Sequence, residues 1–540
     1  GTLLAEKVYE GSIAFGRYPV NIGKNAEIHG QDHPGGLSNA KYDNVRIWND
    51  ALSATDVQGD MQNLSGKPDE SAVLWLPFDR TEEHGDFYTL GIGGRTYGVV
   101  WPDRTVQPEL YQMKKSPQPV KFRALDLKEG QFRLINHFNF TNLNELDYYW
   151  SITSGSDTLD SGTIISPKIS PLDSGAVSIN YDIPTAVPPG TEIFLTIQAI
   201  LAETTEWAPK GHEVAWDQFS LPVGSINSSE ELATSEKFRI RDRRNEIQII
   251  GDQFRYTYHK NSGQFEIERQ DEPVVFEGPM LSVWRAPISN ETDDWGGAIA
   301  REWWQHDLDR LEHTIKNVKV TSTNDIRVDF NASAELRSSD GQSKFDVQYE
   351  YSVQNTGLIS LRTTVQPEDD LPRWLPGLGL NFTLPGSFES FEWFGRGPFE
   401  TYPDRKSGAK IGQYSSTVAD EYVPYLTPQD HGNKTDVRWA SFSEPGSIGL
   451  LITGDEFLNI KASRFNVDNV TRAMYPFQLD ATDSVYVHAG HQITGVGGTP
   501  IATLEKYRTL PRSHAFEISF MPFNQNSQDP EILYEIISNR

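Results

Sequence analysis

Apolar residues that repeat at every second position are the feature that most restricts the fold of this chain. Residues 345–353 (FDVQYEYSV) place five apolar or aromatic side chains on one face, and residues 132–140 (FRLINHFNF) repeat the pattern. Successive side chains of a strand point to opposite faces, so each stretch predicts a half-buried β-strand. Asp340-Gly341 and residues 260–263 (KNSG) are typical of hairpin turns between strands. The chain is therefore predicted to be mainly β.

Helical patterns are few. Residues 108–115 (PELYQMKK) begin with a proline, which suits the first turn of a helix. Residues 296–311 carry large apolar side chains at helical spacing, including Trp303, Trp304 and Leu308. These two windows are predicted to be helices, and the closing residues 525–540 are predicted to be a loosely attached tail.

Composition removes several function classes. The 540 residues include 75 Asp and Glu against 48 Lys and Arg, and the net charge of −27 argues against nucleic-acid binding. The absence of cysteine excludes disulfides, thiolate nucleophiles and cysteine metal sites. No apolar stretch reaches the roughly 20 residues of a membrane span. A neutral polar substrate fits this composition better.

Individual residues leave the chemistry open. Hydrolysis of a glycosidic bond needs two carboxylates about 5 to 10 Å apart, and spacing alone selects no pair here. The densest acidic group is SNETDDWGG, residues 289–297, which reads either as a solvated acidic loop, the favoured interpretation, or as a catalytic pair. His431, His488 and His491 are acid–base groups or, more in keeping with their setting, structural histidines. Aromatic residues between positions 393 and 439 suit either a sugar site or the edge of a core.

An ordered series of motifs resembles the C-terminal half of the large β-galactosidases of glycoside hydrolase family 2. Residues 99–120 resemble the last strand and helix of the family's catalytic (β/α)8 barrel, and the stretch from Phe132 resembles the immunoglobulin-like domain that follows. The closing supersandwich is represented by WRAPISNETDDWG, FGRGPFETYPDR, YVPYLTPQDHGNKTDVRW and ITGVGG. Residues 1–68 are similar to the last strands of a laminin-G or concanavalin-like jelly roll.

The resemblance implies a mainly β, multidomain fold that ends in a galactose mutarotase-like β-supersandwich. Half a jelly roll would expose its apolar face, so the chain is expected to begin inside a domain. The implied division is a partial jelly roll over residues 1–68, a barrel end over 69–118, an immunoglobulin-like sandwich over 119–221, a linker over 222–240, the supersandwich over 241–524 and the tail over 525–540.

The resemblance implies that the longer parent protein is a retaining β-galactosidase that hydrolyses terminal β-D-galactosides. The family's two catalytic glutamates belong to earlier barrel strands, whose motifs do not occur here, so no catalytic residue is predicted in this chain. The chain is expected to supply structural domains and a portion of the pocket wall, and to be inactive alone. The pocket-wall candidates are Asn290, Glu291, Asp293, Trp295, Asp430, His431, Gly497, Gly498 and Thr499.

Two departures from the family bear on the substrate. Relatives follow GVGG with D-D-S-W or D-N-S-W, whose tryptophan helps to form the substrate platform, whereas this chain continues TPIA. Relatives commonly read PQENGN where this chain has PQDHGN, with Asp430 and His431. We therefore expect a preference for galactosides of another shape than lactose. In FGRGPFETYPDR, Glu400 and Asp404 are expected to brace the loop through Arg396 and Arg405.

The remaining expectations concern partners and alternatives. A galactoside or oligosaccharide is the expected substrate, and a homo-oligomer is compatible with the resemblance. No metal or cofactor is predicted in this chain, although magnesium or sodium could act in the longer protein. A periplasmic or extracellular location is favoured for a bacterial glycan-degrading enzyme, and a cytoplasmic location stays open. A stand-alone carbohydrate-binding or scaffolding module, and an aldose epimerase, are the alternative functions.

Overall fold

The computed structural model describes residues 45–48, 52–62, 72–76, 98–226, 231–292, 298–498 and 502–539. The chain divides into two compact units, residues 1–98 and 99–540. In the first unit, β1 (Val45–Trp48) pairs antiparallel with β2 (Ala72–Leu76), and α1 (Ala54–Gln62) lies between them in sequence. Most of the predicted jelly-roll segment lies outside the described residues.

The second unit begins at Val99, and residues 99–107 contain only an isolated bridge between Val100 and Val106, so the strand implied before the helix is not formed. The predicted helix follows at its predicted position. It is α3 (Pro108–Lys115), with Pro108 at its start and Lys114 and Lys115 in its last turn. The helix ends at Ser116, whose side chain donates a hydrogen bond to the Gln112 carbonyl at 2.9 Å. No helix in the described residues is long and apolar enough to cross a membrane.

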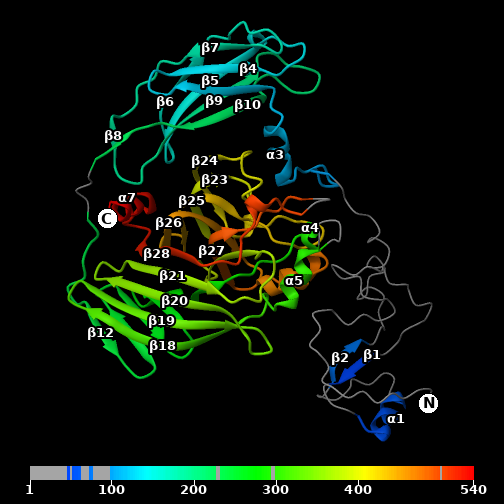
Figure 1. Ribbon diagram of the computed structural model, residues 1–540, viewed down its shortest axis with the longest axis vertical. Helices are drawn as coiled ribbons and strands as arrows, with labels where there is room; N and C mark the ends of the chain where they lie inside the picture. The colour runs from blue at the N-terminus through cyan, green and yellow to red at the C-terminus, as the bar shows by residue number, and fades with distance from the viewer. Residues whose placement is uncertain are drawn as a thin grey trace. The chain divides into compact units, whose positions relative to one another are not determined.

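A small β-sandwich follows α3 (Figure 1). Its two sheets have the orders β10-β9-β5-β6 and β3-β4-β7. A common core fills the space between them. The strands are β3 (Val120–Asp126), β4 (Gln131–Asn136), β5 (Leu146–Ser154), β6 (Asp157–Ile164), β7 (Ser174–Ser178), β9 (Ile193–Leu201) and β10 (Glu213–Ser220).

The strand predicted over residues 132–140 is four residues too long. β4 ends at Asn136, whose side-chain amide donates to the carbonyls of Thr141, Ile169 and Ser170. Those bonds turn the chain away from the sheet, and Phe140 is 95% exposed.

The large supersandwich forms most of the unit. Its twelve-stranded sheet runs β17-β22-β27-β26-β28-β21-β20-β19-β18, with β23, β24 and β25 branching beside β26, and a five-stranded sheet runs β12 to β16 (Figure 1). The smaller sheet packs on the larger one, since the Tyr258 ring lies 5.0 Å from Phe330 and 5.4 Å from Tyr351. The mainly β, multidomain fold is confirmed.

The supersandwich strands have the following bounds: β12 (Arg239–Asp242), β13 (Glu246–Ile250), β14 (Phe254–His259), β15 (Phe265–Arg269), β16 (Glu272–Val275), β17 (Glu277–Ser282), β18 (Glu312–Thr323), β19 (Arg327–Arg337), β20 (Ser343–Gln354), β21 (Ile359–Pro367), β22 (Gly377–Pro385), β23 (Ser390–Gly397), β24 (Lys410–Thr417), β25 (Lys434–Ser443), β26 (Ile448–Ser463), β27 (Ser484–Ile493) and β28 (His514–Asn524). The alternation predicted for residues 345–353 is confirmed in β20, where all five side chains are buried. Both predicted hairpin turns connect antiparallel neighbours.

The helix predicted over residues 296–311 is shorter than expected. α4 (Ser289–Thr292) and α5 (Ile299–Gln305) are two short helices, and Asp307 has a left-handed φ of 57°, which is incompatible with continued helix. Trp303 and Leu308 of the apolar stripe are nevertheless buried, and Trp304 is partly buried. Trp303 donates its indole N–H to the Trp374 carbonyl at 2.6 Å.

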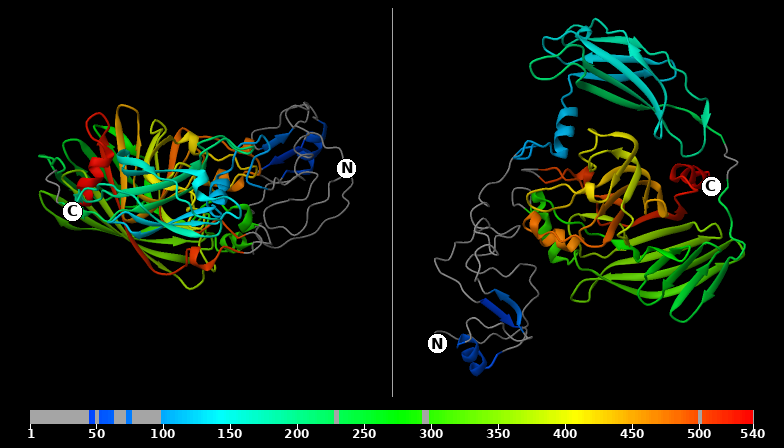
Figure 2. Two further views of the ribbon diagram at one scale, coloured as in Figure 1. Left: turned by 90° about the horizontal axis from the view of Figure 1, so that it is seen from above. Right: turned by 180° about the vertical axis from the view of Figure 1, so that it is seen from behind.

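The closing residues are not a loose tail, as the sequence had suggested. They form α7 (Pro530–Ser538), capped by Asp529, which accepts from the Glu531 N–H at 2.8 Å. Leu533 and Ile536 are buried in a core cluster that also holds Phe194 of the small sandwich and Phe394 of the supersandwich. Figure 2 shows α7 beside the supersandwich strands. The helix therefore joins the two β-domains.

Candidate functional site

The FGRGPFETYPDR loop, residues 394–405, begins inside the last residues of β23, which ends at Gly397, and is braced by buried charges. The Glu400 carboxylate accepts from the Tyr425 hydroxyl at 2.5 Å and the Gly432 N–H at 2.7 Å, and it also contacts Arg405. Arg405 makes a second ion pair with Glu109 of α3. Burial raises the pKa of Glu400, and the bonds from Tyr425 and Gly432 oppose that rise. The expected bracing by Glu400 and Arg405 is confirmed.

The other expected pair of that loop is wrong. Arg396 pairs with Asp436 of β25, whose carboxylate lies 2.5 Å from its Nε atom. Asp404 instead accepts two backbone hydrogen bonds from the glycine-rich GVGG segment, from Val496 N–H at 3.0 Å and Gly497 N–H at 2.7 Å. The FGRGPFETYPDR loop and the GVGG segment, about 90 residues apart in sequence, are thus in direct contact.

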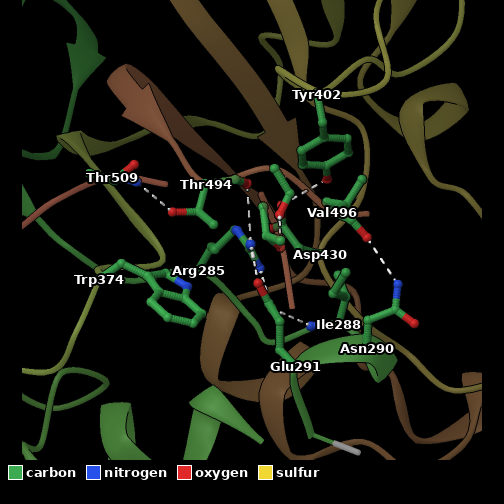
Figure 3. Close-up of polar contacts among 12 residues, drawn as sticks. Arg285, Ile288, Asn290, Glu291, Trp374, Tyr402, Asp430, Thr494, Val496 and Thr509 are labelled. Atoms are coloured by element: carbon green, nitrogen blue, oxygen red, sulfur yellow. Dashed lines mark hydrogen bonds and ion pairs between the residues drawn. The ribbon is translucent and has the colours of Figure 1, made fainter. Parts of the chain in front are cut away.

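An ion pair between Arg285 and Glu291 lies at the centre of these loops (Figure 3). The guanidinium donates to both carboxylate oxygens, with N–O distances of 2.8 and 2.6 Å, and the side chains are only 3% and 4% exposed. The Ile288 N–H also donates to Glu291, at 2.9 Å. Burial lowers the pKa of Arg285, whereas the charge and hydrogen bonds of Glu291 raise it. The contribution of Glu291 is the greater, so the pKa of Arg285 lies above its ordinary value.

The segments on either side are tied to this pair. The Arg285 guanidinium donates to the Thr494 carbonyl at 3.3 Å, and the Asn290 amide donates to the Val496 carbonyl at 3.0 Å (Figure 3). The Ser289 N–H donates to the Gln429 side chain at 2.9 Å. We define residues 285–292, 402–404, 429–431 and 494–498 as the loop cluster.

Asp430 and His431 complete the loop cluster. The buried Asp430 carboxylate accepts from the Tyr402 hydroxyl at 2.8 Å and contacts the Lys461 ammonium. Burial raises the pKa of Asp430, whereas the nearby Lys461 ammonium lowers it. The sum of the effects on Asp430 is a pKa below its ordinary value. His431 shares a hydrogen bond of 2.9 Å with the Gln429 carbonyl, and its ring meets Tyr422 edge-on. Burial lowers the pKa of His431.

The structure brings most of the predicted pocket-wall residues together. Asn290 binds the GVGG segment at Val496, and Glu291 is connected through Arg285 to the neighbouring Thr494. His431 binds the Gln429 backbone, whose side chain binds Ser289, and Asp430 lies between Gln429 and His431 in sequence. Gly498 ends the described portion of that segment, with a φ of 119° that favours glycine. The remaining candidates, Asp293, Trp295 and Thr499, lie outside the described residues.

Sequence reasoning missed three residues of the network, Arg285, Tyr402 and Lys461. Arg285 stands in the quoted WRAP motif between apolar residues, and a lone charge in such a setting indicates a buried ion pair. Lys461 of β26 stands between the apolar residues Ile460 and Ala462, and this setting likewise indicates a buried ion pair. Among the aromatic residues between positions 393 and 439, Trp393 and Trp439 are core residues, with exposed fractions of 0% and 1%.

His488 of β27 is a buried neutral histidine, and this predicts a pH dependence. Burial lowers its pKa to about 3 from 6.5. The unfolded chain binds the proton between these values and the folded chain does not, so stability falls as the pH drops below about 6.5, by up to about 1.4 kcal/mol per unit.

His488→Gln is expected to flatten this slope, measured as the free energy of unfolding in urea at a series of acidic pH values. The exposed His137→Gln is the matched control, which should keep the wild-type slope. Equal slopes for wild type and His488→Gln would contradict the assignment.

Comparisons with known proteins identify the family. The profile described as beta galactosidase small chain matches residues 250–521, about half of the chain, and the one described as beta-galactosidase, domain 4 matches residues 132–222. A β-galactosidase of Priestia megaterium is 30% identical over 404 residues, covering 74% of this chain and 38% of the relative. One of Pseudoalteromonas haloplanktis is 28% identical, covering 74% and 39%.

Among solved structures, a galactose 1-epimerase from Lactobacillus acidophilus aligns with 54% of this chain and 99% of its own, at 9% identity. Its TM-score of 0.30 is too low to support an argument. The chain spans about two fifths of the length of the β-galactosidases it matches. On the match that covers half of its length, the chain belongs to the β-galactosidase small-chain family.

Proposed function

We propose that this chain is the C-terminal region of a retaining β-galactosidase that hydrolyses terminal β-D-galactosides. In this proposal the two catalytic glutamates lie outside these residues, and the loop cluster forms a portion of the wall of the galactoside pocket. Asn290, Gly497 and Gly498 are its proposed substrate-facing residues, together with Asp293, Trp295 and Thr499. Any magnesium or sodium ion would belong to other regions of the longer protein.

The proposal is supported by the carboxylates of the loop cluster, since each of the three in its described residues already has a partner within the protein. Glu291 is paired with Arg285, Asp404 with two backbone amides, and Asp430 with Tyr402 and Lys461. A catalytic acid or nucleophile must reach the glycosidic bond, and these carboxylates are already bound. We infer that these carboxylates hold the loops of the proposed pocket wall in position and do not take part in bond cleavage.

Proton NMR of the hydrolysis product tests the reaction type in the longer protein. With an aryl β-galactoside, the β-anomer of galactose should form first, and the α-anomer should appear only later, by mutarotation.

Larger galactosides should be hydrolysed with a higher kcat/KM than lactose, because the family's platform tryptophan is absent from the sequence after GVGG. The α-anomer as first product, or efficient lactose hydrolysis, would contradict the respective element of the proposal.

A further inference from the structure

Three neighbouring supersandwich strands, β22, β27 and β26, carry a polar surface on one side of the sheet. On β22, β27 and β26 the residues stand opposite one another in register, in two rows. Residues two apart on a strand share a face, so the rows lie side by side. The first row is Asn381, His488 and Lys461, and the second is Thr383, Tyr486 and Ser463.

The opposite face of the same strands belongs to the main core. Leu380 and Leu384 of β22, Val485 and Ala489 of β27 and Ile460 of β26 are all buried there. The polar face is not an ordinary solvent face either, since His488 is only 8% exposed. Polar side chains that are removed from solvent cost free energy unless they gain partners, so this placement is informative.

The polar surface forms the floor of a cavity of about 260 Å³, which we call the sheet cavity. Trp284, Phe465 and the start of α6 (Val467–Arg472) form other sections of its lining, and Asp430 and His431 lie at the Lys461 end. Ligand pockets usually measure roughly 300 to 1,000 Å³, so this one has the size for a single small ring.

The lining combines hydrogen-bond donors and acceptors. The Lys461 ammonium carries three donors, and Asp430 takes one of them. The Nδ1 atom of His488 is hydrogen-bonded to the Asn381 side chain at 2.6 Å. The second ring nitrogen, Nε2, is on the opposite edge of the ring and can make a further hydrogen bond.

The Tyr486 hydroxyl accepts from the Thr482 hydroxyl at 3.3 Å and the Ser463 hydroxyl accepts from the Phe465 N–H at 3.0 Å, so both keep their own O–H as a donor. The Thr383 hydroxyl donates to Glu277 at 3.5 Å and keeps its capacity to accept.

This pattern matches a ligand whose own groups both donate and accept, which is the chemistry of sugar hydroxyls. The Lys461–Asp430 pair neutralises itself, so the cavity offers no excess positive charge to an anion. The rings of Trp284 and Phe465 supply apolar surface for the C–H face of a sugar.

We propose that the sheet cavity binds one neutral monosaccharide, a hexose, as a second site beside the proposed pocket wall. The site stands on the floor of β22, β26 and β27 and needs no residue of the GVGG segment. Asp430 belongs to both places, because it accepts from Tyr402 of the loop cluster and from Lys461 of the cavity.

Isothermal titration calorimetry of the whole 540-residue chain with D-galactose and with D-glucose tests this site. At least one hexose should bind one site per chain, with a Kd of about 1 mM or tighter. Tyr486→Phe removes one hydroxyl and should weaken binding about tenfold. Ser463→Phe should abolish binding by filling the cavity.

The matched control is Tyr149→Phe, an exposed tyrosine of β5 in the small sandwich, which should keep the wild-type affinity. Near-UV circular dichroism shows whether each variant is folded; if Ser463→Phe is not, Tyr486→Phe decides. No binding of either hexose, or a Tyr486→Phe affinity equal to wild type, would overturn the proposal.

Discussion

Replacement of Glu291 by alanine is expected to lower the free energy of unfolding of the supersandwich by about 3 to 5 kcal/mol. The substitution leaves the Arg285 guanidinium buried and without its counter-charge. Arg285 has few other partners, the nearest being the Thr494 carbonyl at 3.3 Å and the Ala286 carbonyl at 3.2 Å. A buried cation cannot recover its hydration from two carbonyls, so the penalty should be large.

Urea unfolding followed by tryptophan fluorescence measures this cost. The control is Glu350→Ala, which removes an exposed ion pair to Arg362 of 4.0 Å and should cost at most about 1 kcal/mol. The double variant Arg285→Met, Glu291→Leu should recover much of the loss, because it removes both charges. A Glu291→Ala cost no greater than that of Glu350→Ala would show that the pair is not the support assigned to it.

The second large effect is expected on activity. Asp404→Ala in the longer protein should lower kcat/KM for an aryl β-galactoside by about 10- to 100-fold, because the Val496 and Gly497 amides lose their acceptor and the GVGG segment shifts. The loss of these bonds should change the free energy of unfolding by only about 1 to 3 kcal/mol.

Initial rates over a range of substrate concentrations provide kcat and KM separately, and thermal unfolding checks the fold. Asp420→Ala is the matched control. Asp420 is an exposed aspartate of a short 3-10 helix (Ala419–Glu421) in the same domain, and its carboxylate accepts from the Thr417 hydroxyl at 2.7 Å. This variant should leave kcat/KM unchanged. Unchanged activity in Asp404→Ala would remove the GVGG segment from the pocket wall.

The local pattern predicted β20 and the two hairpin turns correctly, because period-two alternation and turn residues are recorded in a short stretch of sequence by themselves. The element ends were less accessible. β4 stops where the Asn136 amide binds distant carbonyls, and α5 stops at Asp307, whose backbone φ is positive. The closing helix α7 was missed because its buried residues, Leu533 and Ile536, belong to a core cluster made mostly of residues far away in sequence, such as Phe194 and Phe394.

The loop cluster shows the same limit. Motif order predicted which segments form the proposed pocket wall, and the structure brings the described portions of those segments together. The individual partners could not be predicted, because Asp404 binds amides more than 90 residues away and Asp430, in the loop before β25, binds Lys461 of β26. Both pairings depend on the tertiary fold, which spacing in the sequence does not record.

The most direct test of the account is the rate at which the purified 540-residue chain, produced in a host without its own β-galactosidase, hydrolyses an aryl β-galactoside. The longer protein, assayed in parallel, is the positive control. The account predicts turnover by the longer protein and a rate equal to the buffer blank for the 540-residue chain. Turnover by the chain alone would contradict it, because the catalytic carboxylates would then lie within these residues.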